Sequence, residues 1–201
     1  TLHLGRTITG QRVNLDTQTL TGEGTDVISG FENVEGGYGN DSLTGSADAN
    51  VIRGNAGNDS IIASGGSDTL DGGTGTDTLS YAGFSVALSI DLGAGQITDG
   101  AGKTDSESNF EVLFSGSGDD SITASSSVES ISGGAGNDLV NTGGGDDYVD
   151  AGSGEAELPL VIGAQMDLSP HPQGDGAVLA GHGPPRLVLL AQTRRGYGNL
   201  A

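Results

Sequence analysis

Acidic side chains recur at a fixed interval of nine residues along two stretches of this sequence. Between Gly36 and Ser80, the sixth position of each nine-residue block is an acidic or amide residue, namely Asp41, Asn50, Asp59, Asp68 and Asp77. In a second run, Ser115 to Asp150, the same position holds Asp120, Glu129, Asp138 and Asp147. Carboxylates that lie close together repel one another unless a cation lies between them. The chemistry that this spacing favours is therefore the binding of a hard metal ion.

An apolar residue at the eighth position of each block identifies the element that must position these carboxylates. The residues are Leu43, Ile52, Ile61, Leu70 and Leu79 in the first run, and Ile122, Ile131, Val140 and Val149 in the second. A fixed internal period of this kind decides the architecture. Each block is predicted to form a six-residue turn and a three-residue strand with one inward aliphatic side chain.

Two such blocks make one flattened coil, so residues 18 apart are expected to stack on the same edge. This places Asp41, Asp59 and Asp77 on one edge, with Asn50 and Asp68 on the other. In the second run, Asp120 and Asp138 share an edge, opposite Glu129 and Asp147. Stacked carboxylates would lie about 4.8 Å apart, and calcium suits this arrangement because it takes six to eight oxygen ligands in a tolerant geometry, whereas magnesium requires a stricter octahedron.

We therefore expect calcium sites at Asp41/Asp59, Asp59/Asp77 and Asp120/Asp138. The pairs Asn50/Asp68 and Glu129/Asp147 depart from two aspartates and are expected to be weaker or empty.

The blocks resemble the GGxGxDxUx nonapeptide of the RTX (repeats-in-toxin) haemolysin-type calcium-binding family. Complete GGxGxD matches lie at Gly36 to Asp41, Gly72 to Asp77 and Gly133 to Asp138. Two further blocks keep the last half of the motif, as Gly57-Asn58-Asp59 and Gly145-Asp146-Asp147. The resemblance implies an all-β fold, a parallel β-roll (right-handed β-solenoid) in two short arrays joined by β-strand spacer segments. It also implies several Ca²⁺ ions held by position-six side chains and turn carbonyls.

The residues that we expect to contribute to metal binding are turn glycines and carboxylates. They are Gly36, Gly37, Gly39, Asp41, Gly57, Asp59, Asp68, Gly72, Gly73, Gly75, Asp77, Gly116, Gly118, Asp120, Gly133, Gly134, Gly136, Asp138, Gly143, Gly145 and Asp147.

The chain divides into five predicted segments. They are a β-rich spacer module (1–35), the first array (36–80), a second spacer module (81–115), the second array (116–154) and a divergent, proline-containing tail (155–201). Phe31 precedes Phe110 by 79 residues, as Leu43 precedes Ile122, so the two spacers enter their arrays in the same register. The 43 residues between Leu79 and Ile122 are not a multiple of nine, which indicates two separate arrays.

Two further expectations concern the second spacer and the tail. Asp91 and Asp105 in the second spacer are expected to shape turns rather than to bind calcium. The tail is expected to be a cap or disordered, with residues 187–190 forming a capping strand or part of a secretion signal.

Composition limits both the fold and the partners. The net charge is −20, aromatic residues make up 4% of the chain, and 38 residues are glycine. One inward aliphatic per nine residues is a thin core, too little to offset chain entropy and carboxylate repulsion, so metal binding must contribute to folding directly. The acidity argues against nucleic acid as a partner. The sequence contains no cysteine, and no apolar run approaches the length of a membrane span.

The functional hypothesis is a calcium-binding segment that folds when calcium is abundant. The family resemblance implies a secreted, extracellular bacterial protein, without an N-terminal signal peptide and with a type I secretion apparatus as a partner. Thr1 is not a Met and no secretory segment follows it, so the sequence is expected to be part of a longer polypeptide.

We expect no enzymatic activity in this chain, because neither an HExxH nor a GxSxG motif is present. Three alternatives remain: the C-terminal part of an RTX enzyme or toxin (metalloprotease, lipase, epimerase or haemolysin), part of a surface adhesin, or a solvated linker. The oligomeric state stays open.

Overall fold

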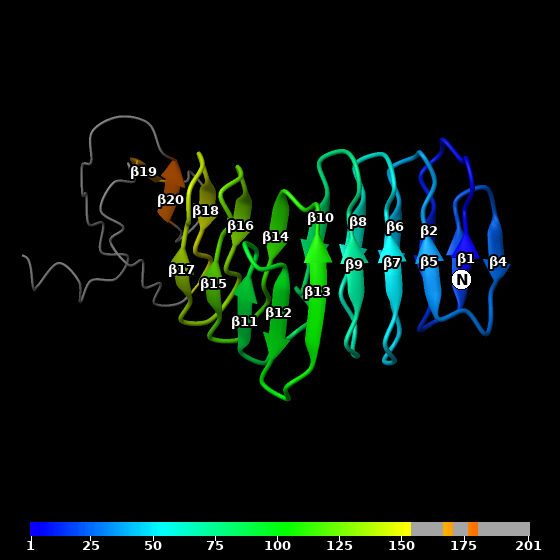
Figure 1. Ribbon diagram of the computed structural model, residues 1–201, viewed down its shortest axis with the longest axis horizontal. Helices are drawn as coiled ribbons and strands as arrows, with labels where there is room; N and C mark the ends of the chain where they lie inside the picture. The colour runs from blue at the N-terminus through cyan, green and yellow to red at the C-terminus, as the bar shows by residue number, and fades with distance from the viewer. Residues whose placement is uncertain (154–166, 171–176, 181–201) are drawn as a thin grey trace, which may run out of the picture.

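The computed structural model describes residues 1–153, 167–170 and 177–180. Within these residues the chain forms short strands joined by turns and contains no helix. The described strands form two sheets, here called sheet A (nine strands) and sheet B (eleven strands), which run side by side along the length of the molecule (Figure 1).

The strands of the two arrays coincide with the nonapeptide blocks. They are β6 (Ser42–Thr44), β7 (Val51–Arg53), β8 (Ser60–Ile62), β9 (Thr69–Asp71), β10 (Thr78–Ser80), β15 (Ser121–Thr123), β16 (Ser130–Ser132), β17 (Leu139–Asn141) and β18 (Tyr148–Asp150). Successive strands alternate between the sheets, with β6, β8, β10, β16 and β18 in sheet B and the others in sheet A. Pairing is parallel, with Leu43 opposite Ile61 and Ile52 opposite Leu70, so each coil spans 18 residues as predicted.

The core of the arrays consists of the aliphatic side chains that the two sheets direct toward each other. In all nine array strands the inward residue is at most 1% exposed. The residues on each side of the inward one, such as Ser42 and Thr44 beside Leu43, point outward, because adjacent side chains on a strand point to opposite faces. The predicted fold class, an all-β parallel β-roll, is confirmed.

The second spacer inserts an antiparallel meander into sheet A only. Its strands β11 (Leu88–Asp91), β12 (Gln96–Asp99) and β13 (Thr104–Ser108) lie between β9 and β15 (Figure 1). In sheet B the same region contributes one strand, β14 (Val112–Phe114), which pairs in parallel with β10 on one side and β16 on the other. Sheet B therefore runs without interruption from the first array into the second.

The first spacer ends the roll on the N-terminal side. Its strands are β1 (Leu2–His3), β2 (Arg12–Asn14), β3 (Thr19–Thr21), β4 (Thr25–Val27) and β5 (Asn33–Glu35). Here the meander, β2 to β4, extends sheet B beyond β6, while β5 and β1 extend sheet A beyond β7. Each spacer thus contributes one three-stranded meander, to opposite sheets.

At the other end, β19 (Asp167–Pro170) and β20 (Ala177–Ala180) form an antiparallel hairpin, and β20 pairs with β18 at the end of sheet B. The segment 187–190, expected to be a capping strand or part of a secretion signal, lies outside the described residues. No helix among the residues described is long and apolar enough to cross a bilayer.

Candidate metal centres

The residue immediately before each strand of the roll lies in one of two rows, one along each long edge. The row that leads into sheet B is Gln11, Asp41, Asp59, Asp77, Glu111, Glu129 and Asp147. The row that leads into sheet A includes Asn50, Asp68, Asp120 and Asp138. Asp105 lies within β13 rather than before it, but stacks on Asp68 in the same row. The array members of both rows are buried, with exposed fractions of 8% or less. Carboxylates are therefore stacked at the bases of the turns, away from bulk water.

One carboxylate oxygen of each stacked aspartate joins two coils. Oδ1 of Asp59 accepts a hydrogen bond from the backbone N–H of Asp41 at 2.7 Å, and Oδ1 of Asp77 accepts one from Asp59 at 2.7 Å. In the second array, Oδ1 of Asp138 accepts the N–H of Asp120 at 2.9 Å. The 18-residue spacing thus gives the same contact at successive coils, as expected for a repeat whose units contact only their neighbours.

The other carboxylate oxygen has no partner at four of these residues. Oδ2 of Asp59, Asp77, Asp120 and Asp138 is buried and forms no hydrogen bond. Burying a polar atom without a partner is costly, and burying an ionised one more so. A cation between the coils would remove this cost, so the residues present fit a metal ion with a preference for hard oxygen ligands.

Glycine at the first position of the turn leaves space beside these oxygens. A Cβ added at Gly54 would contact both Asp59 Oδ2 and the carbonyl oxygen of Gly72 in the next coil. A Cβ added at Gly36 would contact Gly54 O and lie 2.6 Å from Asp41 Oδ2. A side chain here would thus occupy the point at which a carboxylate and a main-chain carbonyl converge.

The electrostatic state of the buried carboxylates agrees with this geometry. Burial raises the pKa of Asp59 to about 6, against the opposing effect of the Asp41 N–H, and the charges of Asp41 and Asp77 raise it further. Burial also raises the pKa of Asp77, Asp120 and Asp138. In the absence of a cation these side chains are therefore poorly stabilised as anions.

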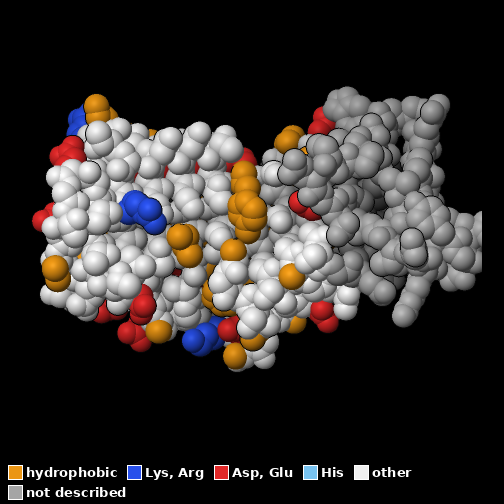
Figure 2. Space-filling model, turned by 180° about the vertical axis from the view of Figure 1, so that it is seen from behind, with side chains coloured by type: hydrophobic (Ala, Val, Ile, Leu, Met, Phe, Trp, Pro, Cys, Tyr) orange, Lys and Arg blue, Asp and Glu red, His pale blue; other side chains and the backbone are white. Residues whose placement is uncertain are grey.

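Few basic side chains are available to neutralise the rows. Residues 1–154 contain 23 acidic and 4 basic residues. Within the part of the chain that the structure describes, both ion pairs involve Glu35, which contacts His3 and Arg53. The surface in Figure 2 is accordingly dominated by backbone and small polar side chains, with few Lys or Arg groups.

Each predicted metal residue lies in a turn along one of the two edges. The turns at the sheet-B edge contain Gly36, Gly37, Gly39, Asp41, Gly57, Asp59, Gly72, Gly73, Gly75, Asp77, Gly143, Gly145 and Asp147. Those at the sheet-A edge contain Asp68, Gly116, Gly118, Asp120, Gly133, Gly134, Gly136 and Asp138. No group of three or more His, Cys, Asp or Glu side chains converges among the described residues. Backbone carbonyls would therefore have to complete any coordination shell.

The pairs that depart from two aspartates have different surroundings. Both polar atoms of the Asn50 side-chain amide have partners, since Nδ2 donates to Glu32 O at 2.8 Å and Oδ1 accepts the N–H of Ser46 at 2.6 Å. Oδ2 of Asp68 contacts the Ser64 hydroxyl at 3.4 Å, whereas Oε2 of Glu129 has no partner. Lower affinity at these positions stays a prediction.

Three spacer residues in these rows, Gln11, Asp105 and Glu111, were not predicted as members. Asp105 was expected in a turn, but it lies within β13, where Oδ1 accepts the N–H of Asp68 at 2.8 Å and Oδ2 accepts the Tyr81 hydroxyl at 2.5 Å. Glu111 accepts the N–H of Asp77 at 2.8 Å. The sequence signal for Glu111 is an acidic residue two positions before an inward apolar residue, as in Asp77-Thr78-Leu79. Asp91 does shape a turn, since its Oδ1 accepts the N–H of Ala94.

A comparison with protein families identifies the repeats. Residues 28–59, 44–79 and 123–155 match the RTX calcium-binding nonapeptide repeat (4 copies). The chain therefore carries RTX repeats. Repeats of this family bind Ca²⁺, with several ions along an array, and are typical of secreted bacterial proteins. A comparison with curated proteins gave no match for this chain.

Proposed function

We propose that this RTX segment is a calcium-controlled folding unit of a secreted protein. It would be unfolded at low calcium concentration, a state suited to passage through a type I exporter, and would fold in the calcium-rich exterior. The observation that supports this most directly is the set of four buried aspartate oxygens without partners, at Asp59, Asp77, Asp120 and Asp138.

The roll has few other sources of stability. Each array strand buries one aliphatic side chain, and the chain carries a net charge of −20. Folding must overcome both the conformational entropy of the chain and repulsion between stacked carboxylates. A ligand that binds only the folded state stabilises it by mass action, so the repeats are proposed to fold and bind calcium together.

Within this mechanism the repeat residues have distinct tasks. Oδ1 of each stacked aspartate holds the backbone of the neighbouring coil. Oδ2 of Asp59, Asp77, Asp120 and Asp138 and the turn carbonyls remain as oxygen ligands, whereas Oδ2 of Asp41 accepts the N–H of Gly37 at 2.8 Å. We assign sites to Asp41/Asp59, Asp59/Asp77 and Asp120/Asp138, the first of which relies on Asp59 Oδ2. Bound calcium would supply the positive charge that allows these carboxylates to remain ionised while buried.

The proposal concerns folding and not catalysis, because the family that matches the chain is a calcium-binding one. An enzyme, toxin or adhesin that contains such a segment would use it in the same way.

A calcium titration followed by far-UV circular dichroism tests the proposal, with magnesium as the control ion. We expect a coil spectrum in chelator and a cooperative gain of β signal with calcium, at concentrations on the order of 0.1–1 mM as in extracellular calcium modules. Magnesium should give no such gain. A full β signal in chelator would contradict the proposal, and so would a coil spectrum that calcium leaves unchanged.

A further inference from the structure

The join between the first array and the second spacer repeats the contacts of the array along the sheet-B edge. Within the array, the N–H of Asp59 donates to a carboxylate oxygen of Asp77 at 2.7 Å. At the join, the N–H of Asp77 donates to Oε2 of Glu111 at 2.8 Å. The strands that follow pair in the same parallel way, with Leu79 opposite Leu113. Glu111 thus takes the place of the next aspartate, although it lies outside every nonapeptide block.

The turn carbonyl of the array is also reproduced at this join. A Cβ on Gly54 would contact Gly72 O, and a Cβ on Gly72 would contact Asn109 O. Asn109 has a φ of 60°, the left-handed conformation that is uncommon for residues other than glycine. Its amide donates to Asp71 at 2.7 Å, which anchors the residue in this position. The Asn109 carbonyl therefore occupies the place that a glycine carbonyl has in the array.

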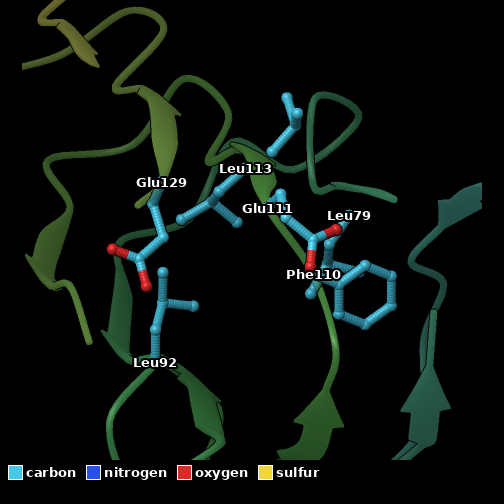
Figure 3. A pocket seen from close by; sticks show the side chains of 7 residues that line it. Leu79, Leu92, Phe110, Glu111, Leu113 and Glu129 are labelled. Atoms are coloured by element: carbon cyan, nitrogen blue, oxygen red, sulfur yellow. The ribbon is translucent and has the colours of Figure 1, made fainter. Parts of the chain in front are cut away.

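Asp77 supplies an unused oxygen that faces this point. The side chain is fully buried, and Oδ2 has no hydrogen-bond partner. That oxygen lies 2.9 Å from the position of a Gly72 Cβ, the same position that the Asn109 carbonyl oxygen contacts. Figure 3 shows the neighbourhood of the join, with Glu111 and Phe110 beside Leu79 and with Glu129 farther along the same edge.

From these contacts we propose an additional calcium site at the join, formed by Asp77 Oδ2, the main-chain carbonyl of Asn109 and the carboxylate of Glu111. It rests on the proposed function, because it takes the same ion as the repeats. It extends the row of sites beyond the last nonapeptide block into the spacer. The ion would connect β10 to β14, the contact through which sheet B passes from one array to the next.

At the sheet-A edge, the join between the first array and the spacer needs no cation. There, Asp105 takes the position after Asp68, but both of its carboxylate oxygens are partnered, one by the Asp68 N–H and the other by the Tyr81 hydroxyl. No oxygen is left over at Asp105, so we place no ion on that edge. The same spacer is thus joined to the first array by hydrogen bonds alone at the sheet-A edge and by the proposed calcium ion at the sheet-B edge.

The test is to count bound calcium ions in the E111Q variant, by equilibrium dialysis and metal analysis at saturating calcium. Glu32→Gln is the matched control, because Glu32 lies 79 residues before Glu111 and precedes β5 as Glu111 precedes β14. Glu32 is exposed, and the repeat residue that stacks on it, Asn50, contacts its main-chain carbonyl oxygen and not its carboxylate. We expect E111Q to bind one ion fewer than the wild-type chain and E32Q to bind the wild-type number, with the same circular dichroism for all three.

An E111Q variant that binds the wild-type number of ions with unchanged affinities would overturn the additional site and leave the proposed function intact. A wild-type chain that binds no calcium would overturn both. If E111Q does not fold at any calcium concentration, E111D carries the test. That variant keeps the charge but has a shorter reach, so one ion should bind more weakly than in wild type, and unchanged affinity for every ion would contradict the site.

Discussion

The stacked aspartates of this roll use their two carboxylate oxygens for different purposes. Oδ1 accepts the backbone N–H of the preceding coil, which sets the distance and register between coils. Oδ2 makes no such contact in Asp59, Asp77, Asp120 or Asp138 and is left for a cation. An asparagine could keep one function but not both, since its amide nitrogen is a donor. Asn50 illustrates this, because its Nδ2 donates to a carbonyl oxygen instead.

Substitution of Asp59 should affect calcium binding more than substitution of an exposed acid. Asp59 lies between Asp41 and Asp77 and is assigned to two sites, so Asp59→Asn should raise the calcium midpoint of folding by about tenfold or more, because ligand charge sets affinity. The control is Asp48→Asn, which removes an exposed carboxylate from a neighbouring turn. Circular dichroism titrations compare the two variants, and equal midpoints would count against the assignment.

Low pH should stabilise the folded chain in the absence of calcium, because protonation removes the charge of the buried carboxylates. In the folded chain without metal, burial raises the pKa of Asp59 and of Asp68 to about 6, from an ordinary value of 3.8. A raised folded-state pKa adds stability that is fully present below the unfolded pKa and is lost as pH rises through the folded one. The metal-free chain should therefore gain β signal as pH falls from about 7 to about 4. Circular dichroism in chelator measures this, and a flat pH profile would contradict it.

At the scale of the strand, three residues and one buried side chain are too little for independent stability. Each array strand depends on parallel neighbours in its own sheet and on the inward residues of the facing sheet. The central aliphatic residue is the one side chain that each array strand places in the core, so its truncation removes that strand's whole contribution. Truncation of one inward residue should consequently be felt by the adjacent coils.

Ile61→Ala tests this dependence. Ile61 is fully buried between Leu43 and Leu79 along sheet B, and removal of such a side chain costs about 2–5 kcal/mol. Ile8→Ala, at a residue that is 81% exposed, should change stability by less than about 0.5 kcal/mol. Urea unfolding at saturating calcium gives both values. A loss at Ile61 as small as that at Ile8 would show that the inward row is not the core.

A buried polar contact within the second spacer holds the meander to the residue that directly follows β10. The hydroxyl of Tyr81, a residue only 1% exposed, donates to Asp105 Oδ2 at 2.5 Å. Tyr81→Phe should destabilise the folded chain by about 1–3 kcal/mol, because it leaves a buried acceptor without its donor. Tyr38→Phe, at a half-exposed ring, is the matched control and should be nearly neutral in the same urea experiment. A neutral Y81F variant would mean that water replaces the hydroxyl.

For the molecule as a whole, the continuity of sheet B decides how the two arrays behave. β14 pairs with β10 of the first array and with β16 of the second, so no break in strand pairing separates the arrays in that sheet. Sheet A is also continuous, but its path runs through the antiparallel meander. Adjacent coils in such a roll stabilise one another through their interfaces. The arrays should therefore fold as a single unit.

Hydrogen exchange with mass spectrometry at graded calcium concentrations tests this coupling. Peptides from 36–80 and from 116–153 should gain protection at the same calcium concentration. Protection of one array well before the other would show that the spacer separates two independent units. The E111Q variant should widen any difference between the two midpoints, because the proposed ion connects β10 to β14.

The amino-acid sequence alone determined the repeat and its consequences. A nine-residue period with an aliphatic at position eight identified every array strand and its inward side chain, from Leu43 to Val149. It also placed the acidic rows on the correct edges, because contacts within an array always join residues 18 apart. Because two nine-residue blocks fix that separation, the sequence period alone predicts these contacts.

Only the tertiary structure decided what happens where the period breaks. Glu111 meets Asp77 across 34 residues, and Asp105 meets Asp68 across 37, separations that no repeat length predicts. The pairing of β14 with β10, and the placing of the meander in one sheet only, arise from strand pairing between distant segments. Such pairing joins segments that are distant in the sequence, so no local pattern encodes it. The continuity of sheet B and the candidate site at the join therefore emerged only from the folded chain.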